Sequence, residues 1–326
     1  MKISINNSFK SLYKKALVTG GAGFIGSHLV DALLELGVEV TVIDNLSAGK
    51  LENLQHHQGD ERLLVVNVDI SSIDEIEPYF IGVDVVFHNA ASKKNICLFN
   101  PARDLDVNAR SALNIMLLAQ KYGIKKVVHA STGSVYGEPE SFPVTEEHKL
   151  NPTSYYGVSK LAGERYVDVF NKLYDINTTI LRYFHVYGPR QESDPSLGGV
   201  VAIFIKNIIN GRSIDIHGDG NQIRSFTYVE DVVAANLLVA VSDESKGQVY
   251  NVASGLKITI NDLVGMLKKR FNGKMNGEIS INYTSSLIGD IKYFDIDNNK
   301  LVNLGVLFTD FDRGLKNTVQ HFTHEG

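Results

Sequence analysis

Two side chains with complementary acid–base chemistry lie four residues apart, at Tyr156 and Lys160. On a helix this spacing places both side chains on one face. A lysine ammonium there stabilises a phenolate, and lowering a tyrosine pKa from about 10 to about 7 takes roughly 4 kcal/mol of differential stabilisation. Tyr155 is a rival for the base, but the residue four positions after it is Ser159, which carries no charge. The pair predicts a proton-transfer site with Tyr156 as the base, against the alternative of a surface helical pair.

A second motif, a glycine-rich turn near the start of the chain, accompanies the Tyr156–Lys160 pair. The apolar segment 16–19 runs into Gly20–Gly26, which contains the pattern G-x-G-x-x-G, and a helical pattern follows over 27–36. The early glycines permit a tight turn and close approach of the backbone to a pyrophosphate, whose charge the helix N-terminus favours. Gly26 lets the helix pack closely against the strand. The turn predicts a dinucleotide-binding site, with a flexible turn as the alternative.

An acidic residue then ends the second apolar segment. Asp44 lies 18 residues after Gly26, at the place where a carboxylate holds the hydroxyls of the adenosine ribose in dinucleotide-binding units. A carboxylate there would repel a 2′-phosphate. The sequence therefore favours NAD over NADP as the cofactor.

The arrangement of apolar segments predicts the elements that position these residues. Short runs rich in β-branched residues alternate with longer amphipathic stretches, and several runs are apolar at consecutive positions, as in strands buried on both faces. The clearest runs are 16–19, 38–43, 63–68, 83–88, 126–130 and 178–182, with helical patterns over 27–36 and 109–122. We expect an α/β fold, a doubly wound (Rossmann) parallel sheet with a smaller mixed α/β substrate-binding domain. The cofactor domain is expected over 1–182 plus about 223–252, and the smaller domain over about 183–222 plus 253–326.

Composition and charge exclude several classes of protein. Of 326 residues, 44% are hydrophobic and 21% are charged, which is typical of a globular chain. The formal net charge of −5 provides no global field for nucleic acid or anionic lipid, so we expect neither as a partner. The only cysteine, Cys97, forms no intrachain disulfide and no cysteine-based metal cage. No signal peptide or membrane-spanning segment is expected, and the predicted location is the cytoplasm.

The motifs together resemble those of the extended short-chain dehydrogenase/reductases, specifically the NAD-dependent nucleotide-sugar epimerase/dehydratase family. The segments that carry the resemblance are Thr19–His28, Asp44–Ser47, Val68–Ile70, His88–Ala91, Ser131–Gly137, Tyr156 with Lys160, Arg182–Phe184, Tyr187–Gln191 and His217–Gly220. The resemblance implies contacts with NAD by Gly20, Gly23, Phe24, Ile25, Gly26, Asp44, Asn45, Asp69, Ile70, Ala90, Ala91, Tyr156 and Lys160. In such a site Asp69 and Ile70 would flank the adenine.

The resemblance also implies a reaction. Thr132 falls where the family keeps a catalytic Ser or Thr that bonds the sugar hydroxyl, and Tyr156 would take the proton of that hydroxyl. Family dehydratases and decarboxylases usually carry an acidic residue just before the Val-Tyr-Gly segment, whereas this chain has Gly133 and Ser134. The expected activity is therefore inversion at C4 of a UDP-hexose through a transient 4-keto sugar.

Residues of the smaller domain are implied to bind the nucleoside diphosphate sugar. They are His185, Arg190, Arg224 and Asp290, together with Thr132 and Tyr156. Three positions depart from the family pattern, since His185 replaces an Asn, Ser225 replaces an Asp, and Leu287 replaces a phosphate-binding Arg. Lys292 or His185 would have to compensate for that arginine. The uridine base is accordingly an expectation from the family alone.

Alternative functions remain open, within the same family and outside it. The chain is alternatively a same-family oxidoreductase, a dehydratase or an epimerase at another carbon, or a regulator that senses NAD without catalysis.

A homodimer is expected from the family, through helices at 108–120 and 161–173 that form a four-helix interface. The adjacent His56 and His57 are interpreted as surface loop residues without a carboxylate at metal-ligand spacing, and no metal is expected.

Phe294 gives the first testable prediction, because it lies four residues after Asp290. By resemblance to 4-epimerases, residue size there controls entry of the substituent at the sugar's C2, and core packing is the alternative. We expect Phe294→Ser to add turnover of N-acetylhexosamine nucleotides, measured against the wild type with both kinds of sugar. Unchanged selectivity would mean that Phe294 is not a gate.

Overall fold

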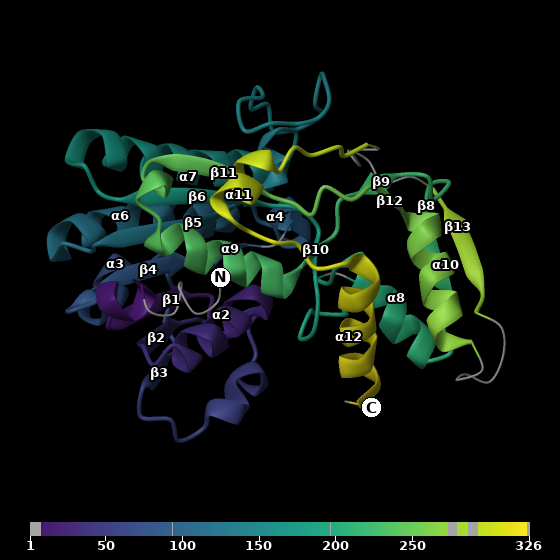
Figure 1. The fold of residues 1–326 in the computed structure, drawn as a ribbon, viewed down its shortest axis with the longest axis horizontal. Coiled ribbons are helices and arrows are strands. Elements are labelled where there is room, and N and C mark those ends of the chain that lie inside the picture. The colour runs from purple at the N-terminus through teal and green to yellow at the C-terminus, as the bar shows by residue number, and fades with distance from the viewer. Residues whose placement is uncertain (1–7, 93, 196, 273–278, 286–292, 325–326) are drawn as a thin grey trace.

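Seven parallel strands form the sheet of the computed structural model (Figure 1). The structure describes residues 8–92, 94–195, 197–272, 279–285 and 293–324. In sheet order the strands are β11 (Gln248–Val252), β6 (Thr178–Tyr183), β5 (Lys126–Thr132), β4 (Val85–His88), β1 (Lys15–Thr19), β2 (Glu39–Ile43) and β3 (Leu63–Val66). The direction of strand succession reverses between β1 and β4, and ligands bind at such a switch point in doubly wound sheets. The predicted doubly wound parallel sheet is confirmed.

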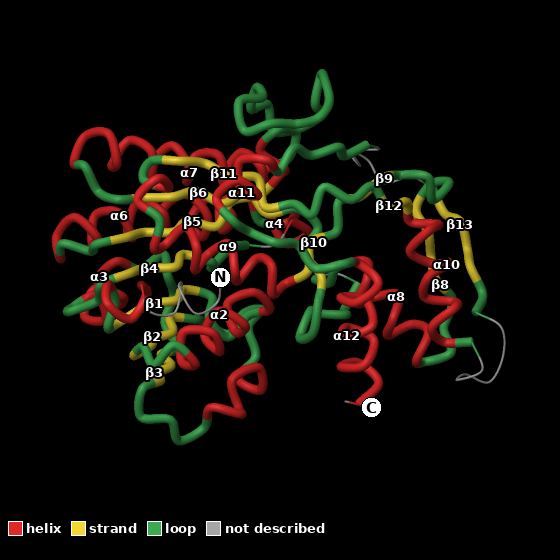
Figure 2. Tube along the Cα trace, viewed as in Figure 1, coloured by secondary structure: helices red, strands yellow, loops and turns green. Residues whose placement is uncertain are grey.

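Consecutive apolar residues give the sheet two buried faces. Val85 and Phe87 on β4 pack into one hydrophobic cluster, and Val86 between them packs into the other. The first cluster is covered by α2 (Phe24–Glu35) and α9 (Val229–Val241), and the second by α6 (Ser111–Tyr122) and α7 (Tyr155–Tyr174). Figure 2 shows these helices on both sides of the strands. Burial on both faces explains why the strands are apolar at consecutive positions.

Short helical segments connect the larger elements. They are η1 (Leu51–His57), α3 (Ile73–Ile76), η2 (Glu77–Phe80), α4 (Lys94–Phe99), α5 (Pro101–Leu105), the π-helical η3 (Asp106–Arg110), η4 (Gly133–Val135) and η5 (Asp243–Ser245). The helix expected over 109–122 is α6, and a π-helical turn precedes it directly. Such turns often accompany functional sites.

A second hydrophobic core lies beside the carboxyl ends of the strands. Its elements are β7 (Val186–Tyr187), α8 (Val200–Ile209), β8 (Ile214–His217), β9 (Ile223–Arg224), β10 (Thr227–Tyr228), β12 (Ile258–Thr259), α10 (Ile260–Phe271), β13 (Ile281–Thr284) and α12 (Phe311–His324). Phe204, Phe226, Leu263 and Phe311 belong to that core. By contrast, α11 (Asn299–Leu304) returns to the large sheet and packs on β11. Among the described residues, no helix is both long and apolar enough to span a bilayer.

The interpretation of His56 and His57 as loop residues is wrong. Both belong to η1, and the Nε2 atoms lie 2.9 and 2.8 Å from Oδ1 of Asp31. That carboxylate comes from α2, 25 residues earlier in the chain. A sequence-local search for a carboxylate does not find it.

Two buried histidines lie side by side on neighbouring strands of the sheet. His88 on β4 pairs in register with His129 on β5, and the ring centroids are 5.2 Å apart. His88 contacts the hydroxyls of Thr19 at 2.7 Å and Ser111 at 3.2 Å, whereas neither ring nitrogen of His129 has a hydrogen-bond partner in the described part of the chain. Burial lowers the pKa of His88 to about 3 and holds the pKa of His129 well below its ordinary value. Both rings are neutral at neutral pH.

This pair predicts that acid destabilises the fold. Below about pH 6.5 the unfolded chain binds a proton at His88 that the folded chain does not bind until about pH 3, so the free energy of unfolding falls as pH falls through this window. At pH 5 the loss from His88 alone is about 2 kcal/mol, at about 1.36 kcal/mol per pKa unit. Urea titrations at several pH values measure it.

The matched comparison is between His88→Gln and His148→Gln. His88→Gln should flatten the dependence of the free energy of unfolding on pH. His148→Gln removes a histidine whose contacts lie within residues 141–148, and it should leave the slope of that dependence unchanged. Equal slopes in the wild type and His88→Gln would contradict the assignment.

Candidate active site

A cavity of about 720 Å³ lies where the strand order reverses. Its wall includes the residues that follow β1, β2 and β4, and the facing wall includes His185, Gln191, Glu192, Leu197, Gly198 and Gly199. Of the predicted site residues, those that line it are Gly20, Gly23, Phe24, Ile25, Gly26, Asp44, Asn45, Ile70, Ala90, Ala91, Tyr156 and His185. Asp69, Thr132, Lys160, Arg190 and Arg224 are not part of the lining. Asp290 lies outside the described residues, as do Leu287 and Lys292.

The glycine turn brings backbone into close contact across this cavity. Gly20 has a φ of +68°, and a Cβ there would lie 2.9 Å from the backbone of Ala90. A Cβ at Gly26 would overlap the carbonyl oxygen of Gly20, so only glycine lets α2 approach β1 this closely. Gly23 caps α2 without a side chain, which leaves the first amides of the helix for an anionic ligand. The turn fits the pyrophosphate of a dinucleotide.

Asp44 is held rigidly at the end of β2. Its carboxylate accepts hydrogen bonds from the amides of Ala22 at 3.0 Å and Leu46 at 2.9 Å. Burial raises its pKa from the ordinary value, while these two hydrogen bonds act in the opposite direction. A Cβ at Gly49 would lie 2.7 Å from the same carboxylate. The fixed carboxylate suits recognition of ribose hydroxyls.

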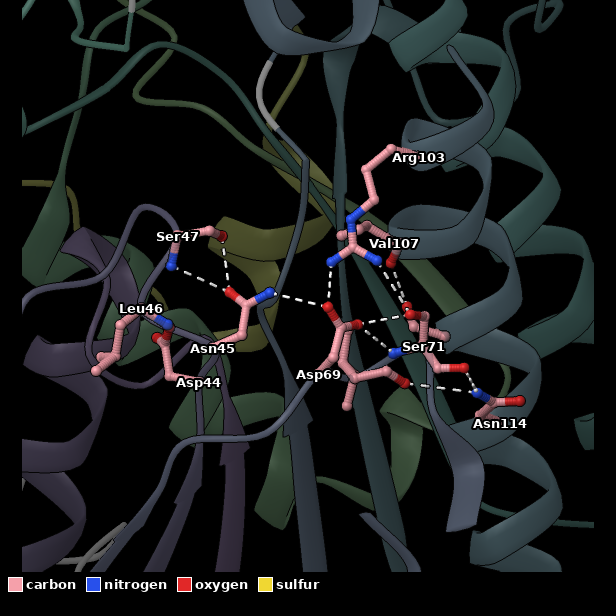
Figure 3. Close-up of polar contacts among 11 residues, drawn as sticks. Asp44, Asn45, Leu46, Ser47, Asp69, Ser71, Arg103, Val107 and Asn114 are labelled. Atoms are coloured by element: carbon pink, nitrogen blue, oxygen red, sulfur yellow. Dashed lines mark hydrogen bonds and ion pairs between the residues drawn. The ribbon is translucent and has the colours of Figure 1, made fainter. Parts of the chain in front are cut away.

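A polar bridge formed by Asn45, Asp69, Ser71 and Arg103 lies beside Asp44, and Asn45 and Arg103 of this bridge line the cavity (Figure 3). Asn45 donates to Asp69 over 3.0 Å, and Arg103 on α5 forms an ion pair with the same carboxylate. Arg103 also donates to Ser71 Oγ over 3.1 Å. Although burial raises the pKa of Asp69, Arg103 and Ser71 hold it well below its ordinary value. Asp69 thus orients Asn45, Ser71 and Arg103 rather than lining the cavity itself.

Arg103 is a site residue that the sequence did not reveal. It is the only lysine or arginine among the described residues that line the cavity. No motif marks it, because its partner Asp69 lies 34 residues away and on a different element. Asn89 is a second residue that the predicted site set omits, and its buried Nδ2 has no acceptor in the described part of the chain. Since Asn89 also lines the cavity, its amide can donate a hydrogen bond to a ligand there.

Of the predicted catalytic residues, Tyr156 lines the cavity, whereas Thr132 and Lys160 do not. Ser154 caps α7 by accepting from the amide of Gly157 over 3.1 Å, which places Tyr156 in the first turn. Thr132, at the end of β5, forms a hydrogen bond with the Tyr156 side chain. Lys160 is 1% exposed and donates its ammonium to the carbonyl of Ala130. The structure therefore pairs Tyr156 with Thr132, whereas the Lys160 ammonium contacts Ala130, and the catalytic roles of the three residues stay a prediction.

The predicted lowering of the Tyr156 pKa is not found. Burial raises it far above the ordinary value, the thiol of Cys97 and the carboxylate of Asp104 raise it further, and the hydrogen bond with Thr132 lowers it only in part. Lys160 does not compensate, since its ammonium contacts the Ala130 carbonyl. Burial also lowers the pKa of Lys160 to about 8, against the opposing charges of Glu164 and Asp104. Tyr156 is a neutral phenol in this state.

Asp104 belongs to a buried network beneath Tyr156. It is 1% exposed and accepts hydrogen bonds from Asn108 Nδ2 at 2.7 Å and from the Cys97 thiol. Asn108, in the π-helical turn, also donates to Ser159 Oγ over 2.9 Å and accepts from the amide of Ser92. The network connects α5 and η3 to α7. It holds the helix that carries the acid–base pair.

A buried ion pair supports the opposite side of α7. Arg182 on β6 and Glu164 on α7 are 2.8 Å apart, and both side chains are 3% exposed. Glu164 also accepts from Ser131, next to Thr132, and Arg182 donates to the hydroxyl of Tyr136. Removing one partner of such a pair typically costs about 3–5 kcal/mol because the other charge remains buried. These contacts fix the distance between β5 and α7.

The predicted substrate residues occupy different environments. His185, with a φ of +38°, lines the cavity, and its ring centroid lies 5.2 Å from that of Phe294. The guanidinium of Arg224 lies 5.8 Å from the Phe294 ring, which is itself 7% exposed. Arg190 instead forms an ion pair with Asp31 on α2. Because that contact lies away from the cavity, the structure does not bring Arg190 to the site, and its role toward substrate stays a prediction.

Known proteins resemble this chain over most of its length. The model of the NAD dependent epimerase/dehydratase family matches residues 16–253. A putative UDP-glucose 4-epimerase of Methanocaldococcus jannaschii is 40% identical over 292 residues, which cover 89% of this chain and 92% of that protein. A UDP-N-acetylglucosamine 4-epimerase from Methanobrevibacter ruminantium in complex with UDP-N-acetylmuramic acid has a TM-score of 0.90 and 36% identity, covering 96% and 99% of the two chains. The UDP-glucose 4-epimerase of Thermotoga maritima with UDP-glucose has a TM-score of 0.88 and 38% identity, covering 95% and 99%.

The polar bridge predicts slow release of NAD, the cofactor of the family. Arg103→Gln removes the ion pair that fixes Asp69, so the adenosine end of the cavity opens more readily. A partly exposed ion pair is worth up to about 1 kcal/mol, which corresponds to a roughly five-fold faster loss of NAD. The rate is measured by the NAD that remains with the protein during dialysis. Arg110→Gln is the matched control, since Arg110 pairs with Asp106 outside the cavity lining; equal rates in the two variants would refute the role of Arg103.

Proposed function

The chain belongs to the NAD-dependent epimerase/dehydratase family, and we propose that it inverts C4 of a UDP-hexose with NAD as a recycled cofactor. The observation that supports the proposal is the hydrogen bond between Thr132 and Tyr156 at the cavity that Tyr156 lines, with Lys160 buried on the same helix as Tyr156. The 4-epimerase relatives agree with it. Glycines, Asp44 and Asn89 would hold the cofactor through backbone amides, a carboxylate and an amide donor.

Each residue of the set has a distinct role in this reaction. Thr132 orients the C4 hydroxyl of the sugar, and Tyr156, as the phenolate, takes its proton and becomes the neutral phenol. Lys160, with a pKa of about 8, keeps its charge at neutral pH and favours the phenolate before this transfer. Bound NAD would supply the acceptor for the hydride of C4 and then the donor that returns it. Rotation of the flat 4-keto sugar exposes its other face, and Tyr156 then gives its proton back.

The surroundings of Tyr156 do not by themselves favour its phenolate. Burial, Cys97 and Asp104 raise its pKa, and the hydrogen bond with Thr132 lowers it only in part. The positive charges of Lys160 and of the nicotinamide of bound NAD would therefore have to stabilise the phenolate before it takes a proton.

The same surroundings speak against elimination or decarboxylation. Gly133 and Ser134 occupy the positions where those family members usually carry an acid. A Cβ at Gly133 would overlap the ring of Phe184, so an acidic side chain at 133 requires repacking of that ring. Phe184 is 2% exposed and packs against Tyr136 and Phe294. With no carboxylate at 133 or 134, the proposal assigns proton transfer to Tyr156, which lines the cavity.

The base and the sugar are the open part of the proposal. UDP-glucose agrees with the first relatives, whereas the N-acetyl substrate of the Methanobrevibacter enzyme would meet the buried Phe294 if this residue is the gate. Uridine, thymidine, cytidine and guanosine diphosphate sugars offered without added NAD identify both. Product without added cofactor supports epimerisation, and a need for stoichiometric NAD supports net oxidation.

The family expectation of a homodimer receives support from two helices. Leu117 on α6 and Tyr166, Val169 and Leu173 on α7 are exposed apolar side chains. Two such helix pairs from two chains would bury these side chains in the predicted four-helix interface. A cytoplasmic location likewise stays a prediction from the sequence.

The role of Tyr156 predicts a large loss of turnover in Tyr156→Phe. Without the phenol, the proton of the C4 hydroxyl has no acceptor. General-base catalysis typically contributes about 10²- to 10⁴-fold to the rate, so turnover should fall by about this factor. The rate of interconversion of UDP-glucose and UDP-galactose, at saturating substrate, measures the effect. Tyr155→Phe is the matched control because Tyr155 is its neighbour on α7 and is 55% exposed. Wild-type turnover in Tyr156→Phe would exclude the phenol as the base.

A further inference from the structure

Three potential metal ligands converge on the outer side of the sheet domain. The Nε2 atoms of His56 and His57 lie 2.9 and 2.8 Å from Oδ1 of Asp31, and all three ligand atoms lie within 4.8 Å of one another. The two rings are close, with centroids 4.1 Å apart. None of the three residues lines the catalytic cavity. The proposed reaction therefore leaves this cluster without a role.

We propose that Asp31, His56 and His57 form a binding site for a divalent cation of the zinc type. Two imidazole nitrogens and one carboxylate oxygen are common ligands of Zn²⁺. Tetrahedral Zn²⁺ with bonds of about 2.0–2.2 Å requires ligand atoms about 3.3 Å apart. The observed hydrogen-bond distances need to widen by only about half an ångström. Mg²⁺ and Ca²⁺ are disfavoured because they prefer oxygen ligands.

Arg190 supplies the outer contact that orients the carboxylate. Its guanidinium pairs with Oδ2 of Asp31, so Oδ1 points to the two imidazoles. Arg190 is in turn held by His28 Nδ1 at 2.9 Å and by the carbonyl of Asn53 at 3.0 Å. Hydrogen-bonded ligating carboxylates are a regular feature of metal sites. The positive charge of Arg190 weakens the affinity, but it also fixes the one oxygen that binds.

Exposure provides an entry path and a place for water. The His56 side chain is 52% exposed, whereas His57 and Asp31 are 17% and 21% exposed. An ion bound by three protein ligands thus has its fourth position on the solvent side, next to His56. The ion would connect η1 to α2, and through Arg190 it would connect both to the turn that follows β7. Since the ligands come together only in the folded chain, binding should stabilise the fold.

Zinc content and thermal stability test the proposal together. Tag-free full-length protein is dialysed against Zn²⁺, and bound metal is measured by mass spectrometry of the digested sample. We expect the wild type to hold one more zinc ion per chain than the His56→Gln/His57→Gln variant and to melt at a higher temperature with Zn²⁺ than without it. Glutamine retains a donor to Asp31, so the variant should fold.

Controls separate this site from other zinc-binding groups. His148→Gln should keep the zinc ion and the rise in melting temperature, because His148 contacts Ser141 and Thr145 in a separate loop. Mg²⁺ in place of Zn²⁺ should give no rise. Melting without metal shows whether the double variant is folded; if it is not, His56→Gln alone is used. Equal zinc content in the wild type and the folded variant would overturn the proposal, as would a rise in melting temperature that the variant retains.

Discussion

The charge of Lys160 in the protein interior is the constraint on which the rest of the site depends. The side chain is 1% exposed, and burial lowers its pKa to about 8. An isolated ammonium there would lose its proton, so opposite charges have to be present. Glu164 and Asp104 supply them. Both carboxylates are themselves buried and held, the first by Arg182 and the second by Asn108.

These charge partners decide where the elements lie. The Glu164–Arg182 pair ties α7 to β6, and the bond from Ser131 to Glu164 brings in the end of β5, next to Thr132. On the other side, Asn108 ties the π-helical turn to α7 through Ser159. The helix that carries Tyr156 is thereby held between two networks, and Asn45 and Arg103, the partners of Asp69, line the same cavity as Tyr156. The residues proposed for cofactor binding and for proton transfer thus share one frame.

Residues that act through local backbone geometry were predictable from the sequence, and those that act through distant partners were not. The glycine turn, Asp44 and the Tyr156–Lys160 pair can each be recognised within one short stretch of the sequence. Arg103, Asp104 and Asn108 lie on short helical segments without a motif, and the contacts that define them cross between elements. For the same reason the sequence does not predict the carboxylate of Asp31 beside His56 and His57. It predicts a lowered pKa for Tyr156, whereas burial and the buried neighbours raise that pKa.

Conversion of UDP-glucose in deuterium oxide tests the central claim most directly. The protein is used as purified, without added NAD, and the sugar carbons are followed by NMR. If Tyr156 exchanges only the hydroxyl proton and C4 recovers its own hydrogen, UDP-galactose forms with ordinary hydrogen at C4 and at C5. Deuterium at either carbon, or no C4 epimer until NAD is supplied in stoichiometric amounts, would contradict the account.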